Sequence, residues 1–277
     1  MTTALRPLNT GELLDRTFSL YRSHFGLFVS IFAIPHLVVL AFQCVGISFR
    51  SPTPQLSNFL VGFLWQMGVL LLTLVASAAS QAATVIAVSR VHLDQPVNVS
   101  ESFAYVKNRI FWVILLSLLV GFVAFMALFA LIVPGILLFI MWSLAVPAMV
   151  LENKGVLDSM SRSSDLTQGS RGRIFVILFV IVVLSIAVSA LLQWPIALAA
   201  GVRFFARGNL QQMGIGWGVA SLVATFVSQS LVGPLGTIAL SLVYYDQRIR
   251  REAFDLQLMM MTLDAPPAPS SPAQVGA

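Results

Sequence analysis

His36 is the ionisable side chain that lies within a predicted membrane span of this 277-residue sequence, and it directly follows Pro35. An ionisable residue inside a bilayer marks a proton or ion path by default. The alternative is structural. Pro35 has no N–H and leaves a carbonyl free one turn earlier, to which a neutral imidazole can bond. The sequence leaves both roles open for His36.

A second candidate for intramembrane chemistry is the stretch SQSLVGPLGT in the last apolar run, which contains Gln229, Gly233 and Pro234. A helix broken at such residues leaves backbone groups unpaired, and discontinuous helices often build substrate sites in transporters. Glycine and proline are also ordinary in membrane helices, where a packing kink explains them. We treat His36, Gln229, Gly233 and Pro234 as one candidate intramembrane polar site, with a packing kink as the alternative.

The polar connections offer a different chemistry, because arginine and lysine side chains bind the phosphate groups of lipids. The candidate lipid-phosphate contacts are Lys107, Arg109, Arg162, Arg171 and Arg173. The alternative is that these residues are solvated loop charges that follow the positive-inside rule.

No arrangement typical of an active site occurs in the sequence. The histidines His24, His36 and His92 are not spaced as metal ligands, and no His-Cys-carboxylate cluster exists. The stretch TQGSRGR lacks the lysine-serine ending of a phosphate loop, and no Gly-x-Ser-x-Gly elbow occurs. We therefore predict a protein that is not an enzyme, with no catalytic residue, cofactor or metal. The single Cys44 excludes an intramolecular disulfide.

These candidate residues lie in or beside long apolar runs. The chain is 58% hydrophobic and 10% charged, with a mean hydropathy of +0.90, whereas soluble domains carry about 25% charged residues. Apolar runs of about 18 or more residues predict transmembrane helices. The predicted spans cover about 25–49, 58–88, 110–131, 134–151, 174–200 and 217–245. The expected fold is an all-α integral membrane protein with six transmembrane helices.

The distribution of charge predicts the orientation of these spans. All 16 lysines and arginines fall on one side of the membrane except Arg50, Arg203 and Arg207. The positive-inside rule then places both termini in the cytoplasm. The 11 acidic residues fall on the same side. The net charge of +5 therefore indicates topology and attraction to anionic lipid rather than binding of nucleic acid.

A short motif recurs in front of the odd-numbered spans. PLNTGE at 7–12 matches PVNVSE at 96–101, where Asn9 and Asn98 are expected N-caps with a glutamate three residues later. A weaker copy begins at Asn153, which is expected to be the third N-cap. After the first cap an apolar stripe follows helical spacing, at Leu14, Phe18, Tyr21 and Phe25. This predicts amphipathic cytoplasmic interfacial helices and three helix-span-span units; the alternative is ordinary capped loops.

The remaining residues fit one polytopic membrane domain over 1–251 and a cytoplasmic tail over 252–277. The end of the tail, APPAPSSPAQVGA, has no apolar periodicity and is expected to be disordered from about 265.

Two stretches carry a family resemblance: RPLNTGELLDRTFSLYRSHFG near the start and WSLAVPAMVLENKGVLDSMSRSSDLTQGSRGRIF across the fourth span and its loop. They resemble the glycerophosphoryl diester phosphodiesterase membrane-domain family, whose relatives include uncharacterised bacterial six-span inner-membrane proteins. The resemblance implies a lipid-associated bacterial membrane module with no catalytic residues to transfer. The chain is expected to have no room for the phosphodiesterase barrel that gives the family its name.

These observations predict a non-enzymatic accessory or scaffold module in envelope or lipid physiology, with membrane lipids and a membrane or cytoplasmic protein as partners. The alternative is a transporter or channel for a lipid or small amphipathic solute. A phosphodiesterase remains possible only if a partner supplies the active site. A transporter predicts a polar cavity reaching mid-membrane between His36, Gln229 and Gly233, and a scaffold predicts tight packing there.

Overall fold

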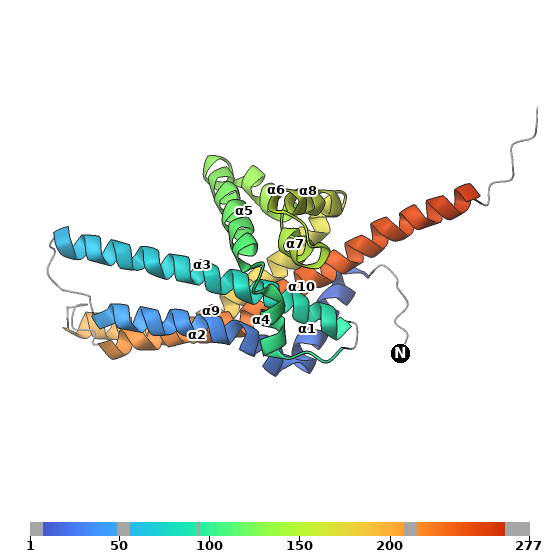
Figure 1. Cartoon of the computed structure of the whole chain (residues 1–277). Coiled ribbons are helices and arrows are strands. Elements are labelled where there is room, and N and C mark those ends of the chain that lie inside the picture. The colour runs from blue at the N-terminus through green and yellow to red at the C-terminus, as the bar shows by residue number, and fades with distance from the viewer. Residues whose placement is uncertain (1–7, 49–55, 93–94, 208–214, 264–277) are drawn as a thin grey trace, which may run out of the picture.

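The structure is a computed structural model that describes residues 8–48, 56–92, 95–207 and 215–263. Every regular element in these ranges is a helix (Figure 1). The helices are α1 (Thr10–Ser23), α2 (Phe25–Ser48), α3 (Leu56–His92), α4 (Val99–Val106), α5 (Ile110–Ala130), α6 (Ile132–Met141), α7 (Ala145–Glu152), α8 (Val156–Thr167), α9 (Arg171–Arg207) and α10 (Ile215–Leu263).

Six segments of the described chain are long and apolar enough to cross a membrane, which confirms the all-α integral membrane fold. They are Phe25–Ile47, Ser57–His92, Ile110–Ala127, Ile132–Glu152, Arg171–Val202 and Gly216–Arg251. The last helix continues well beyond the predicted span, since α10 ends at Leu263, inside the predicted tail. The predicted disorder from about 265 lies outside the described residues.

The long helices α2, α3, α9 and α10 run side by side, and α5 and α6 form a hairpin that diverges from them (Figure 1). Small side chains allow α3 to approach its neighbours closely. Ala79, Ser80, Ala83 and Thr84 are all buried, as expected for a small-residue packing face. The short helices α1, α4, α7 and α8 gather at one end of the molecule, hereafter the polar end. The opposite end, where α2 ends and α3 begins, is hereafter the far end.

Helices α1, α4 and α8 precede the first, third and fifth spans, in the order that the repeated motif predicts. At the first copy, the backbone N–H of Asn9 donates to the Glu12 carboxylate over 2.9 Å, as a capping box requires. The face of α1 against the bundle overlaps the predicted stripe in part, since Leu14 and Tyr21 pack against the buried core. Leu13 and Thr17 are fully buried, whereas Phe18 is exposed.

The predicted third N-cap, Asn153, is wrong. Helix α8 begins at Val156 after Gly155, and Asn153 instead follows the last residue of α7 with φ 61° and ψ 33°. This left-handed conformation ends a helix, and asparagine adopts it more readily than most residues. The third copy of the motif therefore combines the stop signal of one helix with the start of the next.

The fourth span is discontinuous, because α6 ends at Met141 and α7 begins at Ala145. The buried hydroxyl of Ser163 on α8 bridges the break. It donates to the Met141 carbonyl over 2.7 Å and accepts from the Leu144 N–H over 3.1 Å. Thr167 also donates to the Met141 carbonyl, over 3.3 Å. Irregular backbone at membrane depth requires such partners, so α8 stabilises the fourth span as well as preceding the fifth.

Replacing Ser163 by alanine is expected to lower the free energy of unfolding by about 1–3 kcal/mol, because it leaves the buried Leu144 N–H without its acceptor. Thermal unfolding of the purified protein in detergent measures the loss. The matched control is Ser161→Ala, which alters an exposed hydroxyl on the same helix and should leave the melting temperature unchanged. Equal melting temperatures for the two variants would contradict this role of Ser163.

Candidate functional site

His36 and Gln229 lie together at a small cavity between α2, α3 and α10. The cavity has a volume of about 40 Å³, and Thr73 and Thr225 also line it. That volume accommodates only a few water molecules, since one water needs about 10–15 Å³ measured in this way. The structure therefore brings two of the predicted intramembrane residues together without a wide passage between them.

The His36 ring is held by the helix that carries it. Its Nδ1 lies 2.8 Å from the carbonyl oxygen of Phe32, and the Phe32 ring stacks on the imidazole with 5.9 Å between centroids. A carbonyl only accepts, so Nδ1 carries the proton in this bond. The expected bond to the carbonyl freed by Pro35 is not formed by His36. That carbonyl belongs to Ile31, and the buried hydroxyl of Ser80 on α3 donates to it over 3.2 Å.

Gly233 and Pro234 lie beyond this cavity and do not line it. Helix α10 continues through both residues, so the last span contains no break there. Gly233 allows α2 and α10 to approach each other closely, since a Cβ at this position would lie 2.5 Å from the Phe32 ring. Gly233 and Pro234 therefore serve the packing of α10 against α2 and do not form part of a polar site in this structure.

Replacing Gly233 by alanine is expected to lower the free energy of unfolding by about 1–3 kcal/mol, because the added methyl group displaces the buried Phe32 ring. The matched control is Gly236→Ala on the same helix, whose Cβ would make an ordinary 3.8 Å contact with Ile181. Thermal unfolding in detergent compares the two proteins. A melting temperature lowered equally by both substitutions would show that Phe32 is not the cause.

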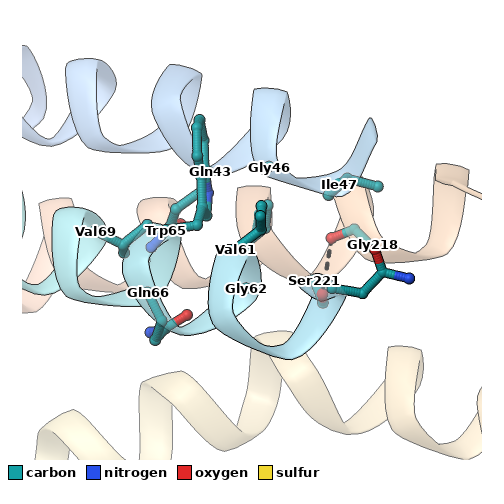
Figure 2. Close-up of a pocket in the computed structure, with 12 residues that line it drawn as sticks. Gln43, Gly46, Ile47, Val61, Gly62, Trp65, Gln66, Val69, Gly218 and Ser221 are labelled. Carbon is teal, nitrogen blue, oxygen red and sulfur yellow. Dashed lines mark hydrogen bonds between the residues drawn. The ribbon is translucent and has the colours of Figure 1, made fainter. Parts of the chain in front are cut away.

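A larger cleft opens at the far end of the same three helices, with a volume of about 580 Å³ (Figure 2). Gln43 and Ile47 reach it from α2, Trp65 and Gln66 line it on α3, and Ser221 lines it on α10. Gln43 also lines the small cavity at His36, as does Leu222. The cleft and the cavity are therefore successive parts of one polar seam between α2, α3 and α10.

The polar end contains a buried carboxylate that joins three distant parts of the chain. Asp246 on α10 has a side chain only 2% exposed. One of its oxygens lies 2.6 Å from Arg173 at the start of α9 and 2.9 Å from Arg250. The other accepts from the backbone N–H of Leu8, just before α1, over 2.8 Å. Both arginines also donate to the Leu8 carbonyl, so the start of α1 is held from both sides.

A second carboxylate at the polar end connects the fourth span to the last. Glu152 at the end of α7 accepts from the hydroxyl of Tyr244 on α10 over 2.7 Å. It also pairs with Arg162 on α8 at 2.9 Å and with Lys154 at 2.6 Å. Tyr244 is fully buried, so its hydroxyl depends on this carboxylate.

A tyrosine fastens α1 to the last span. The Tyr21 hydroxyl donates to the Leu231 carbonyl over 2.7 Å. Burial raises the pKa of Tyr21 above its ordinary value, so the hydroxyl remains the donor. Together with Asp246, this bond ties α1 to α10 at two places.

The predicted lipid-phosphate residues separate into two groups. Arg162 and Arg173 bind Glu152 and Asp246 within the protein. In the part of the chain that the structure describes, Lys107, Arg109 and Arg171 form no ion pair. Lys107 is exposed at the end of α4, and Arg109 lines a cavity of about 190 Å³ beside α5.

Sequence reasoning missed Asp246, Glu152 and Tyr244 as organising residues. Their position in the sequence could have indicated this role, because Asp246 and Glu152 each lie where an apolar run meets a polar segment. Within the described residues, no group of three or more His, Cys, Asp and Glu side chains could hold a metal ion.

These features define a multi-pass helical membrane protein whose polar end is cross-linked by the carboxylates of Asp246 and Glu152 and whose long helices enclose a polar seam. Comparison of the chain with models of protein families, with curated proteins and with solved structures gives no match.

Proposed function

We propose that this chain is a non-enzymatic accessory or scaffold module of the bacterial inner membrane, acting in envelope or lipid physiology. The observation that supports it is the small volume at mid-span, where the cavity at His36 and Gln229 has only about 40 Å³. A solute-conducting protein needs a wider polar space there. At the polar end, which its charge favours for the cytoplasmic side, Asp246 and Glu152 cross-link the helices.

A scaffold also needs a surface for a partner within the membrane, and α5 provides one. Phe111, Trp112, Phe122 and Phe125 on this helix are more than half exposed, and α5 diverges from the long helices (Figure 1). Aromatic side chains are enriched in protein interfaces. Lys107 and Arg109, which precede this helix, are placed to contact lipid phosphate or an acidic partner.

The experiment has two arms. Photoreactive amino acids at Phe122 and Phe125 are expected to cross-link to a protein of defined mass in the native membrane, whereas one at Leu64 on α3 should label mainly lipid. Proteoliposomes that contain the purified chain are expected to move fluorescent phospholipids no faster than protein-free liposomes. Labelling of lipid alone at all three positions would contradict the scaffold.

The second candidate is a transporter or channel for a lipid or small amphipathic solute, which the polar seam from the far-end cleft to His36 favours. It predicts protein-dependent movement of lipid or solute in the same proteoliposomes. That movement should fall when His36 is replaced by alanine. The stated resemblance to a phosphodiesterase membrane domain fits either candidate, since it concerns the membrane region alone.

A further inference from the structure

The cleft at the far end of the bundle has the size and lining of a ligand site (Figure 2). Its volume of about 580 Å³ lies within the range of about 300–1,000 Å³ that small-molecule sites occupy. The side chains that give it polarity are Gln43, Asn58, Gln66 and Ser221. Among the described residues that line it, none carries a charge.

Two of these polar groups are available to a ligand. In the described part of the chain, the side-chain amides of Gln43 and Gln66 have no hydrogen-bond partner within the protein. Gln43 is partly buried and Gln66 is exposed, so both amides can donate to and accept from a ligand in the cleft. The Ser221 hydroxyl donates to the Gly218 carbonyl over 2.8 Å and keeps its acceptor capacity. Hydroxyl groups on a ligand can donate to and accept from both amides, and can donate to the Ser221 oxygen.

One wall of the cleft is aromatic. The Trp65 ring stacks on Phe42 with 4.2 Å between centroids and an interplanar angle of 5°. It lies against α2 at Gly46, where any side chain would overlap the Trp65 Nε1 atom. On α3, Val61 lines the cleft and is 54% exposed, and the nearby Phe59 and Leu64 are 69% and 68% exposed. A polar pocket thus adjoins a surface that suits hydrocarbon chains.

We propose that this cleft binds the headgroup of a membrane lipid whose head is uncharged and hydroxylated, as in a diacylglycerol or a neutral glycolipid. The amides and Ser221 bind the hydroxyl groups, and the acyl chains lie along the exposed face of α3. A phosphate headgroup is disfavoured, because the described lining offers it no opposite charge as it leaves water. This binding does not depend on whether the chain is a scaffold or a transporter.

The test uses the full chain, purified in mild detergent, and native mass spectrometry with three lipids of identical acyl chains. These are diacylglycerol, monoglucosyl-diacylglycerol and phosphatidylglycerol. At least one of the two neutral lipids is expected to bind about tenfold more tightly than phosphatidylglycerol, a difference equivalent to roughly two net hydrogen bonds. Phosphatidylglycerol binding as tightly as both neutral lipids would overturn the proposal.

Two variants locate the binding. Gly62 lines the cleft, and a Cβ there meets no atom within 4 Å, so the first side-chain atom of Gly62→Phe is accommodated and its ring is expected to fill the cleft. It is expected to weaken neutral-lipid binding about tenfold. The matched control is Gly121→Phe on α5, where a Cβ also meets no atom within 4 Å and which should bind lipid as the unmodified protein does.

The second variant, Gln43→Leu, removes the amide at nearly constant volume and is expected to abolish the preference for the neutral headgroup. It keeps the test decisive if Gly62→Phe fails to fold. Unchanged preference in Gln43→Leu, or equal binding by the two glycine variants, would overturn the assignment of the site.

Discussion

Replacing Asp246 by alanine is expected to lower the free energy of unfolding by about 3–5 kcal/mol, the largest effect expected of any single substitution in the described chain. The substitution removes the one acidic partner that Arg173 has among the described residues, and the Arg173 side chain is only 18% exposed. It also removes the acceptor of the Leu8 N–H. Thermal unfolding in detergent measures the loss, and amide hydrogen exchange should increase at the start of α1 and α9.

The matched control is Asp165→Ala, which alters an exposed acid on α8 and should leave stability unchanged. The variant Asp246→Asn keeps an acceptor for the Leu8 N–H and is expected to lose less than alanine does. A double variant, Arg173→Met with Asp246→Leu, should lose less than the sum of its single variants, because neither charge is then left buried without its partner. Additive losses would show that the two side chains do not interact.

The sequence predicts the six spans well because each depends on a local property, the length of an apolar run. The ion pair between Arg173 and Asp246 depends on residues that are 73 positions apart. Nothing in the local sequence distinguishes Arg173 from Arg171. Among the described residues, Arg173 pairs with Asp246, whereas Arg171 has no acidic partner. Charge patterns thus predict the side of the membrane on which a residue lies, but its partner depends on how the helices pack.

The discontinuity in the fourth span combines a local signal with a distant contact. Proline and glycine direct attention to Pro35 and Pro234, yet α2 and α10 continue through both. The chain instead breaks at Trp142, Ser143 and Leu144, just before α7. Pro147 in the first turn of α7 has no N–H for the Ser143 carbonyl, and its ring crowds that carbonyl. The break is stable because Ser163, which comes later in the sequence, satisfies the free backbone groups. Pro147 therefore gives a local signal for the break, whereas the stabilisation of the break by Ser163 depends on how α8 packs.

The candidate intramembrane site was predictable in part. His36 and Gln229 do lie at one cavity, because both are polar groups at similar depth in neighbouring helices. Gln43, which connects this cavity to the far-end cleft, was not singled out, since one glutamine in an apolar run gives no pattern. The hydrogen bonds within the site were not predictable from local sequence. The Ile31 carbonyl accepts from Ser80 on another helix rather than from the nearby His36.

The second large effect is expected at Glu152, where replacement by alanine should lower the free energy of unfolding by about 3 kcal/mol. The buried Tyr244 hydroxyl then loses its acceptor, and Arg162 and Lys154 lose their acidic partner. Because Glu152 ends α7, hydrogen exchange should increase in α7 and α8 while the start of α1 keeps its protection. This pattern separates the Glu152 variant from the Asp246 variant, which should affect α1.

The matched variant for this carboxylate is Tyr244→Phe, which removes a single hydroxyl and should cost about 1.5–3 kcal/mol, the usual worth of a hydrogen bond to a charged group. Combining it with Glu152→Ala should add little to the loss from Glu152→Ala alone, because the bond is already absent. Greater amide hydrogen exchange at the start of α1 in either variant would show that the Glu152–Tyr244 contact and the Asp246–Leu8 contact are not independent. If the exchange patterns remain distinct, α10 holds the start of α1 and the fourth span through independent side chains, Asp246 and Tyr244, which lie two residues apart.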